Sequence, residues 1–430
     1  MFKYLFLIFS IFLVSFSCNS NAPKAKTQNT AVERIGSQEQ NEAQEQDEAE
    51  KIENAVFSDK NSYVQDRSYY LNSPYIKELL ELENIETLGI GDDAPRNLSF
   101  LNNLEQLKEL RISVDFHREM LESLINVYNL PNLEILKVSC TFRTRLKSLD
   151  FLKNFTHVKS LTINCKNVVD YNALKLMNNL EYLKIENMTI TDSSLFSDMK
   201  KLKELEWRAY DIKNTLDEKE LFNLPNLEYL RLEGYIFFTN IDIDKIISSS
   251  PNLKKMWISD VKEYYDITNI VTLKNLEELT IFLNDNHEPR PDSIDLTNIG
   301  TLEKLKKLEV NCVNINSIAN LQNPNLEYLI LSGRYGHEIN FNLLSGLKNL
   351  KSLYLGSGKV NDVRPLLKFP NLERVEFGSS VQYTDISPLA ESNTIKEIEI
   401  WNGRYGYVEI PVKLFENKGI TLDIKNGFGE

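Results

Sequence analysis

The amino-acid sequence predicts an α/β solenoid, a curved horseshoe with a parallel concave β-sheet and with short helices, 3-10 turns and loops on the convex side. The first observation is a recurring pattern, LxxLxxLxL, which spans Leu347 to Leu355 in its clearest copy. The second is its rhythm, because the copies follow one another at spacings of 21 to 29 residues. A unit this short cannot bury its own apolar face and needs a similar neighbour on each side. The copies are marked by Ile85, Leu107, Leu133, Val158, Leu180, Leu202, Leu227, Leu253, Leu276, Leu305, Leu326, Leu350, Leu372 and Ile395.

Several copies also share a short sequence motif: PNLEIL begins at Pro131, PNLEYL at Pro225 and Pro324, and PNLERV at Pro370. With these motifs the chain resembles the leucine-rich repeat family, and within it the short bacterial cell-surface type typified by internalins. The resemblance covers about Leu79 to Ile400. It implies the horseshoe fold and a binding role, with a protein as the expected partner. The sequence has no GxSxG nucleophile elbow or other catalytic motif, so we expect no enzymatic activity.

The N-terminus has the features of an export signal. Lys3 gives a short basic region, Tyr4 to Phe16 is almost continuously apolar, and a small residue precedes Cys18. This order resembles a bacterial lipoprotein signal, which implies a signal peptide over 1–17 and lipidation of Cys18. Ser15 departs from that pattern, where Leu or Val is usual. The alternative is an ordinary cleaved signal followed by an incidental cysteine.

The following segments differ in composition. Residues 18–66 are rich in Gln, Glu, Asn and Lys, which predicts a disordered tether behind the lipidated cysteine. Ser73 and Pro74 read as a helix start, so we expect residues 67–84 to form an N-terminal helical cap. The repeats, about 14 of them, then occupy 85–401. Residues 402–430 are expected to form a C-terminal cap with a last strand through Ile420, Leu422 and Ile424.

Alternation within each strand sends its leucines inward and the residues between them outward. Trp207 takes an inward position and Trp257 an outward, solvent-accessible one. Two residues beyond the second leucine lies a turn position that is usually small, and it holds Cys140, Cys165 and Cys312. Adjacent cysteines invite a disulfide in an exported chain. Their odd number at a packing position favours free, buried thiols instead.

The segments between strands vary in length. Apolar residues at helical spacing predict convex helices from Phe116 to Tyr128 and from Ile241 to Ile247, while Val360 to Leu366 leaves room only for a 3-10 turn. The polar insertion Asn284 to Ser293 is a second candidate for a functional loop. The leucine-rich repeat family more often places Asn or Cys one residue after this turn position, and because of that departure a continuous asparagine ladder is not expected.

Composition excludes several classes of function. The formal net charge is −13 at pH 7, which disfavours nucleic acid as a partner because phosphates need a basic face. The sequence has no HExxH or paired-cysteine spacing, so we expect no metal and no cofactor. The GSGK at Gly356 lacks the earlier glycine of a phosphate-binding loop. We expect a chain attached to the membrane through its lipid alone, located in the cell envelope and monomeric.

The outward columns of the predicted sheet carry acidic and basic side chains in similar numbers, together with aromatic residues. Aromatic side chains near arginine are the residue types that dominate protein-binding hot spots. We therefore expect the concave face to bind a macromolecule, most often a protein. The alternatives are a glycan or cell-wall binder, a structural component of the envelope, or aromatics that serve only the sheet. The candidate ligand-binding residues are Tyr229, Arg231, Trp257, Phe282, Tyr328 and Tyr354.

Overall fold

The computed structural model describes residues 85–92, 94–141, 143–188, 190, 192–208, 224–233, 240–259, 268–282, 296–311, 321–332, 338–402 and 410–426. Cys18, the tether, the expected helical cap at 67–84, Cys312 and the insertion Asn284 to Ser293 lie outside these residues.

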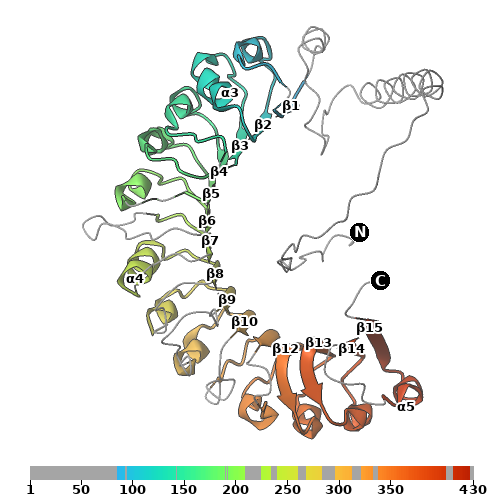
Figure 1. Cartoon of the computed structure of the whole chain (residues 1–430). Helices are drawn as coiled ribbons and strands as arrows, with labels where there is room; N and C mark the ends of the chain where they lie inside the picture. The colour runs from blue at the N-terminus through green and yellow to red at the C-terminus, as the bar shows by residue number, and fades with distance from the viewer. Residues whose placement is uncertain are drawn as a thin grey trace, which may run out of the picture. The chain divides into compact units, whose positions relative to one another are not determined.

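One parallel sheet organises the repeats, and its strands follow in chain order from β1 to β15 (Figure 1). Each of the leucine-pattern copies supplies one strand, and the last strand follows Ile420. The order, in which every strand pairs with the next copy, confirms the predicted solenoid; the sheet is open, because β1 and β15 do not pair. The strands are β1 Thr87–Ile90, β2 Glu109–Val114, β3 Ile135–Cys140, β4 Ser160–Cys165, β5 Tyr182–Glu186, β6 Glu204–Arg208, β7 Tyr229–Glu233, β8 Lys255–Ser259, β9 Glu278–Phe282, β10 Lys307–Asn311, β11 Tyr328–Ser332, β12 Ser352–Val360, β13 Arg374–Tyr383, β14 Glu397–Asn402 and β15 Thr421–Asn426.

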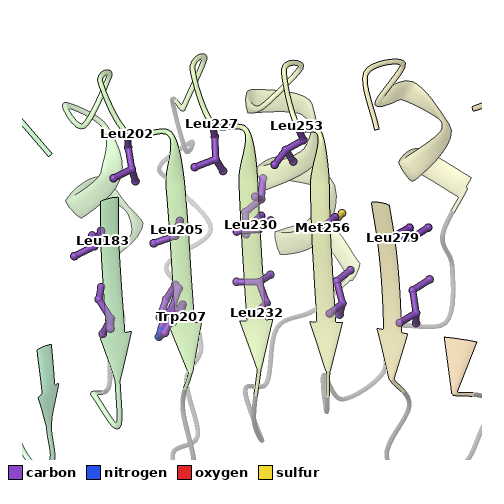
Figure 2. Packing of buried hydrophobic residues seen from close by; sticks show 14 of the residues in the cluster. Leu183, Leu202, Leu205, Trp207, Leu227, Leu230, Leu232, Leu253, Met256 and Leu279 are labelled. Carbon is purple, nitrogen blue, oxygen red and sulfur yellow. The ribbon is translucent and has the colours of Figure 1, made fainter. Parts of the chain in front are cut away.

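The core consists of equivalent apolar side chains stacked from repeat to repeat. Leu205, Leu230 and Met256 occupy matched positions on three consecutive strands and are buried (Figure 2). Trp207 lies in the next stack, between Ile185 and Leu232 of the adjacent strands; it is fully buried as predicted, and its ring lies 5.6 Å from that of Phe196. Strict alternation of inward and outward residues therefore fixes which side chains form the opposite, outward face of the sheet.

Short helical segments lie on the other side of the sheet from that outward face (Figure 1). The two longer convex helices are found as α3, continued by η2, and as α4, while the segment near Val360 has the expected 3-10 turn, η10. The apolar residues of this segment divide between core and solvent: Met120, Leu121, Leu124 and Val127 are buried, whereas Phe116, Ile125 and Tyr128 are exposed. The segments are η1 Ser99–Asn103, α3 Arg118–Ser123, η2 Leu124–Asn126, η3 Asp150–Asn154, η4 Asn172–Leu176, η5 Ser193–Phe196, α4 Asn240–Ser249, η6 Thr268–Thr272, η7 Thr297–Thr301, η9 Phe341–Leu344, η10 Arg364–Lys368, η11 Ser387–Glu391 and α5 Val412–Glu416.

The last strand is present as expected: β15 pairs in parallel with β14, placing Leu422 opposite Ile398 and Ile424 opposite Ile400. The helix α5 precedes it and buries Phe415. Ile424 nevertheless remains 38% exposed, because no further repeat among the described residues stacks beyond it.

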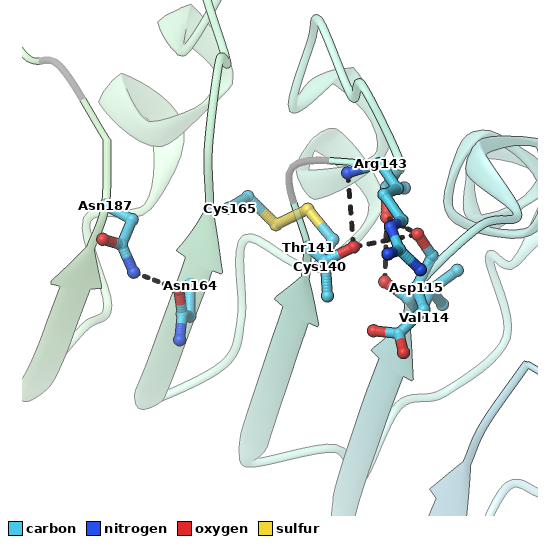
Figure 3. Close-up of a disulfide and its surroundings, with 9 residues drawn as sticks. Val114, Asp115, Cys140, Thr141, Arg143, Asn164, Cys165 and Asn187 are labelled. Atoms are coloured by element: carbon cyan, nitrogen blue, oxygen red, sulfur yellow. Dashed lines mark hydrogen bonds between the residues drawn. A yellow bond between two sulfur atoms is a disulfide. The ribbon is translucent and has the colours of Figure 1, made fainter. Parts of the chain in front are cut away.

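The cysteines correct a sequence-based expectation. Cys140 and Cys165 form a disulfide, whereas the sequence favours free thiols (Figure 3). They are register partners on β3 and β4, and their Cα atoms are 4.8 Å apart, within the range that a disulfide spans. Counting cysteines along the chain does not show that two of them face each other across one strand pair. Asn187, at the equivalent position on the next repeat, adopts a left-handed φ of 60° and donates its side-chain amide to Asn164 Oδ1.

Asparagines do form a ladder, although not at the turn position. In eight of the repeats the residue before the marker leucine is an asparagine, and its side-chain amide donates to a backbone carbonyl of the preceding repeat. These bonds satisfy carbonyls where the chain turns into the sheet. They join Asn132 to Glu105, Asn179 to Thr156, Asn226 to Lys200, Asn252 to Pro225, Asn275 to Pro251, Asn325 to Glu303, Asn349 to Pro324 and Asn371 to Lys348.

Candidate ligand-binding face

The outward face of the sheet carries a central row of side chains, one from each strand. The pairing places Arg231 next to Trp257, Trp257 next to Thr280, and Thr280 next to Glu309. Ile330 and Tyr354 continue the row on the following strands. We call these six residues, from Arg231 on β7 to Tyr354 on β12, the central row. Because parallel strands lie about 4.8 Å apart, the row spans about 25 Å.

Four of the predicted binding residues form one cluster on β7, β8 and β9. The guanidinium carbon of Arg231 lies 4.2 Å from the centre of the Trp257 ring, and that ring lies 5.3 Å from the ring of Phe282. Arg231 also pairs with Glu233 at 2.6 Å. Beside it, burial and the charge of Glu206 raise the pKa of Tyr229. Cation–π contact, ring stacking and the ion pair together hold these side chains in one arrangement.

Trp257 points outward as predicted, but the expectation that it is freely accessible is wrong. Its side chain is partly buried, because Arg231 covers it from one neighbouring strand and Phe282 from the other. Its indole Nε1 is buried and donates no hydrogen bond within the described residues. Sequence alternation gives the side of the sheet on which a residue lies, whereas its exposure depends on neighbours that are distant in the chain.

Tyr328 and Tyr354 lie on the same face, further along the sheet. Tyr328 is 47% exposed, while Tyr354 is partly buried. The Tyr354 hydroxyl leans over Gly378, where a Cβ atom would come within 3.0 Å of it. The structure therefore places all six predicted residues on one face but in two groups, separated by β10 and its central residue Glu309.

Most charged side chains of this face neutralise one another. Arg208 pairs with Glu186, Glu206 and Glu233, and similar networks surround Glu109 and Glu399. Of the partly buried outward acids on the described strands, Glu309 alone has no ion pair. Burial raises its pKa, although Lys307, Thr280 and Arg231 act in the opposite direction. The carboxylate thus lies in the centre of the face without an ion pair to any described residue, although the charges of Lys307 and Arg231 act on it from further away.

A second cluster, on β13 to β15, lies outside the residues that the sequence suggests. The indole of Trp401 donates to Glu376 at 3.1 Å, and the ammonium of Lys425 lies 5.0 Å from the Trp401 ring. Burial and the neighbouring charge of Glu399 raise the pKa of Glu376, while Arg374 pairs with both acids. The alternating residues of the last strand could have revealed Lys425 as part of the outward face.

The residue that follows each marker leucine shows a pattern that spans the whole repeat array: it alternates between Glu and Lys without a break. We call this row of exposed and half-buried residues the charged flank. Six ion pairs along it join a Glu to the Lys of the next repeat, at 2.6 to 2.9 Å. A shallow groove of about 640 Å³ lies beside its middle members, including Glu181, Lys203 and Lys254. The alternation is legible in the sequence: Glu86, Lys108, Glu134, Lys159, Glu181, Lys203, Glu228, Lys254, Glu277, Lys306, Glu327, Lys351, Glu373 and Lys396.

Two features are absent from the described residues. No helix among them has the length and hydropathy of a membrane span. No group of three His, Cys, Asp or Glu side chains among them is arranged to hold a metal ion.

No family model and no curated protein matches the chain. Several solved structures are similar to it. One is an internalin (inlF) from Listeria monocytogenes, with 18% identity and a TM-score of 0.49 over 80% of this chain and 97% of the other. Another is a leucine-rich repeat protein of Leptospira interrogans, with 18% identity and a TM-score of 0.43 over 82% and 99%. A third is the protein of a TLR13–ssRNA13 complex, with 15% identity and a TM-score of 0.45 over 76% and 55%.

Proposed function

We propose that this chain is an exported, lipid-anchored leucine-rich repeat protein that binds a protein partner through the concave face of its sheet. The observation that carries the proposal is the cluster of Tyr229, Arg231, Trp257 and Phe282, in which an arginine and three aromatic side chains converge on three adjacent strands. Such side chains, held in place before binding, lose little conformational freedom when a partner arrives.

The arrangement favours a protein over a glycan. A sugar ring stacks on an open aromatic face, and the ring of Trp257 is covered by Arg231 and Phe282. What the cluster offers instead is a group of partly buried aromatic side chains beside paired charges, which resembles the core and rim of a protein interface. We therefore place the partner over β7 to β12, with Tyr328 at the exposed part of the site.

Site-specific photo-crosslinking in intact cells tests this face. A photoreactive amino acid replaces Tyr328 in one variant and Tyr128 in the matched control. Both residues are exposed, at 47% and 78%, but Tyr128 lies in a convex segment. We expect a discrete crosslinked protein from position 328 alone. Crosslinking from position 128 alone would move the site to the convex side.

Substitution provides the quantitative test with the partner so identified. Trp257→Ala should weaken binding by about 1–4 kcal/mol, as expected when a hot-spot residue is truncated. Tyr128→Ala should leave the affinity within about 0.5 kcal/mol, as expected of a surface change away from an interface. Equal losses would show that the cluster is not the binding site.

Export and anchoring rest on different features. The apolar segment that ends before Cys18 supports secretion, and the disulfide between Cys140 and Cys165 supports an oxidising destination such as the cell envelope. Cys18→Ala should abolish the acyl mass on the N-terminal peptide and shift the protein from the detergent phase to the aqueous phase. A variant that still enters the detergent phase with an acylated peptide would rule out Cys18 as the anchor.

A further inference from the structure

Glu309 lies in the centre of the concave face and forms no ion pair with any described residue; the charges of Lys307 and Arg231 act on it only from a distance. Within the described residues its side chain accepts one hydrogen bond, from Thr280 Oγ1 at the long distance of 3.4 Å. The apolar residue Ile330 flanks it on the other side. By contrast, Glu233 pairs with arginine at 2.6 Å on the same face. A partly buried carboxylate without a counter-ion lowers stability.

At two other places on the same face, a carboxylate is paired with a cation that also lies over an aromatic ring. Arg231 lies over the ring of Trp257 and pairs with Glu233. Lys425 lies over the ring of Trp401 and pairs with Glu399. Each arrangement consists of a carboxylate, an aromatic ring and a cation that contacts both.

Around Glu309 two of these three components are present. Phe282 and Tyr328 occupy the diagonal positions on the adjacent strands, within reach of a side chain placed over Glu309. Tyr354 lies two strands away, and the charge of Glu309 contributes to raising its pKa after burial and the charge of Glu376. The component that is missing from the described residues is a cation paired with Glu309: Lys307, opposite Tyr328, and Arg231 act on the carboxylate without forming an ion pair with it.

We propose that Glu309 receives a basic side chain of the protein partner, an arginine before a lysine, which inserts between Phe282, Tyr328 and Tyr354. The inference rests on the proposed function of this face and specifies the chemistry of its partner. A guanidinium can bind a carboxylate through two N–H donors while its plane stacks on a ring, which an ammonium cannot do. The formal charge of −13 further favours encounter with a basic surface.

The test uses the full chain and a defined probe, an end-blocked dodecapeptide of alternating glycine and arginine, titrated at low salt and compared with its lysine counterpart. Glu309→Gln keeps the shape of the side chain and removes the charge. Glu204→Gln is the matched control, since Glu204 is an exposed outward acid on β6, four strands before Glu309 and outside the central row. We expect the wild type to bind the arginine peptide with a Kd below about 1 mM. Glu309→Gln should weaken that binding about 10-fold, and Glu204→Gln less than about 2-fold.

Several outcomes would overturn the inference: no binding by the wild type, equal losses in the two variants, or equal affinity for the lysine peptide. Thermal unfolding at pH 8 separates a ligand site from a structural role, because removing an unpaired charge should leave Glu309→Gln at least as stable as the wild type. A destabilised variant would assign Glu309 to the fold. If Tyr328 crosslinks a partner whose affinity Glu309→Gln leaves unchanged, the proposed function stands and this inference fails. If position 128 crosslinks instead, both fail.

Discussion

Gly300 is predicted to be indispensable for packing between two repeats. It lies in η7, and a Cβ atom at this position would come within 2.1 Å of the carbonyl oxygen of Gln322. An ordinary contact between these atoms is above about 3 Å, so Gly300→Ala must push the two segments apart by about 1 Å. The obstructing atom belongs to the backbone and cannot rotate away.

Asn323 holds the two segments at this distance. Its side chain is fully buried and its amide donates to the carbonyls of Ile299 and Leu302, at 3.2 and 3.1 Å. A shift of about 1 Å breaks both bonds and leaves buried polar groups unsatisfied, at about 1–3 kcal/mol each. We therefore expect Gly300→Ala to lower the free energy of unfolding by about 2–5 kcal/mol.

Gly346 provides the control, because it faces the same residue from the next repeat. A Cβ atom there would lie 3.0 Å from the side-chain Cγ of Gln322, which can move. Gly346→Ala should cost less than about 1 kcal/mol. Urea unfolding followed by far-ultraviolet circular dichroism measures both variants. Equal midpoints for the two variants would refute the argument from Asn323.

Three further predictions concern the core, the disulfide and the central acid. Leu353→Ala should lower the free energy of unfolding by about 2–5 kcal/mol, because Leu353 is fully buried. Lys351→Ala removes an exposed ion pair with Glu327 and should lower it by about 0–1 kcal/mol. Urea unfolding measures both variants, and equal losses would contradict the assignment of inward and outward positions. Replacing Cys140 and Cys165 with Ala should cost about 3 kcal/mol, given a sequence separation of 25 residues, and unfolded wild-type protein should show fewer reactive thiols before reduction than after it. Because the pKa of Glu309 is raised on folding, its ionised form opposes folding above that pKa and this effect disappears as pH falls below it. Glu309→Gln should thus raise Tm at pH 8 but not at pH 3. The charged and titratable groups that face Glu309, which include Arg231, Lys307 and Tyr354, are unchanged in the variant. A Tm difference that is the same at both pH values would exclude the ionisation of Glu309 as its source.

Much of the fold is predictable because it depends on local periodicity. The positions of Leu353 and Trp207 follow from alternation along a strand, and α4 follows from the spacing of its isoleucines. Each of these features depends on the sequence of a single repeat. They come out correctly without knowledge of what lies in the neighbouring repeat.

The candidate site is less predictable because it depends on contacts between repeats. Alternation places Trp257 correctly on the outward face, but its partial burial arises from Arg231 and Phe282 on other strands. The Cys140–Cys165 bond escapes prediction for a different reason: the repeat pattern places both cysteines at equivalent positions of adjacent repeats, but the odd number of cysteines at that position favours free thiols. Glu309 is one acid among many in the sequence, and what distinguishes it is the lack of an ion pair with any described residue.

The charged flank gives the array a period that its leucines do not have. Every leucine-rich unit is equivalent to the next, yet the alternation of Glu and Lys makes each unit equivalent only to the next but one, as in Glu181 and Glu228. The natural building block of the chain is therefore a pair of repeats, which is consistent with growth by duplication of pairs. Insertion or deletion of a single repeat would place like charges side by side at the junction. Removal of two consecutive repeats preserves the alternation of Glu and Lys. Longer or shorter versions of this scaffold should therefore be made by inserting or deleting two repeats at a time.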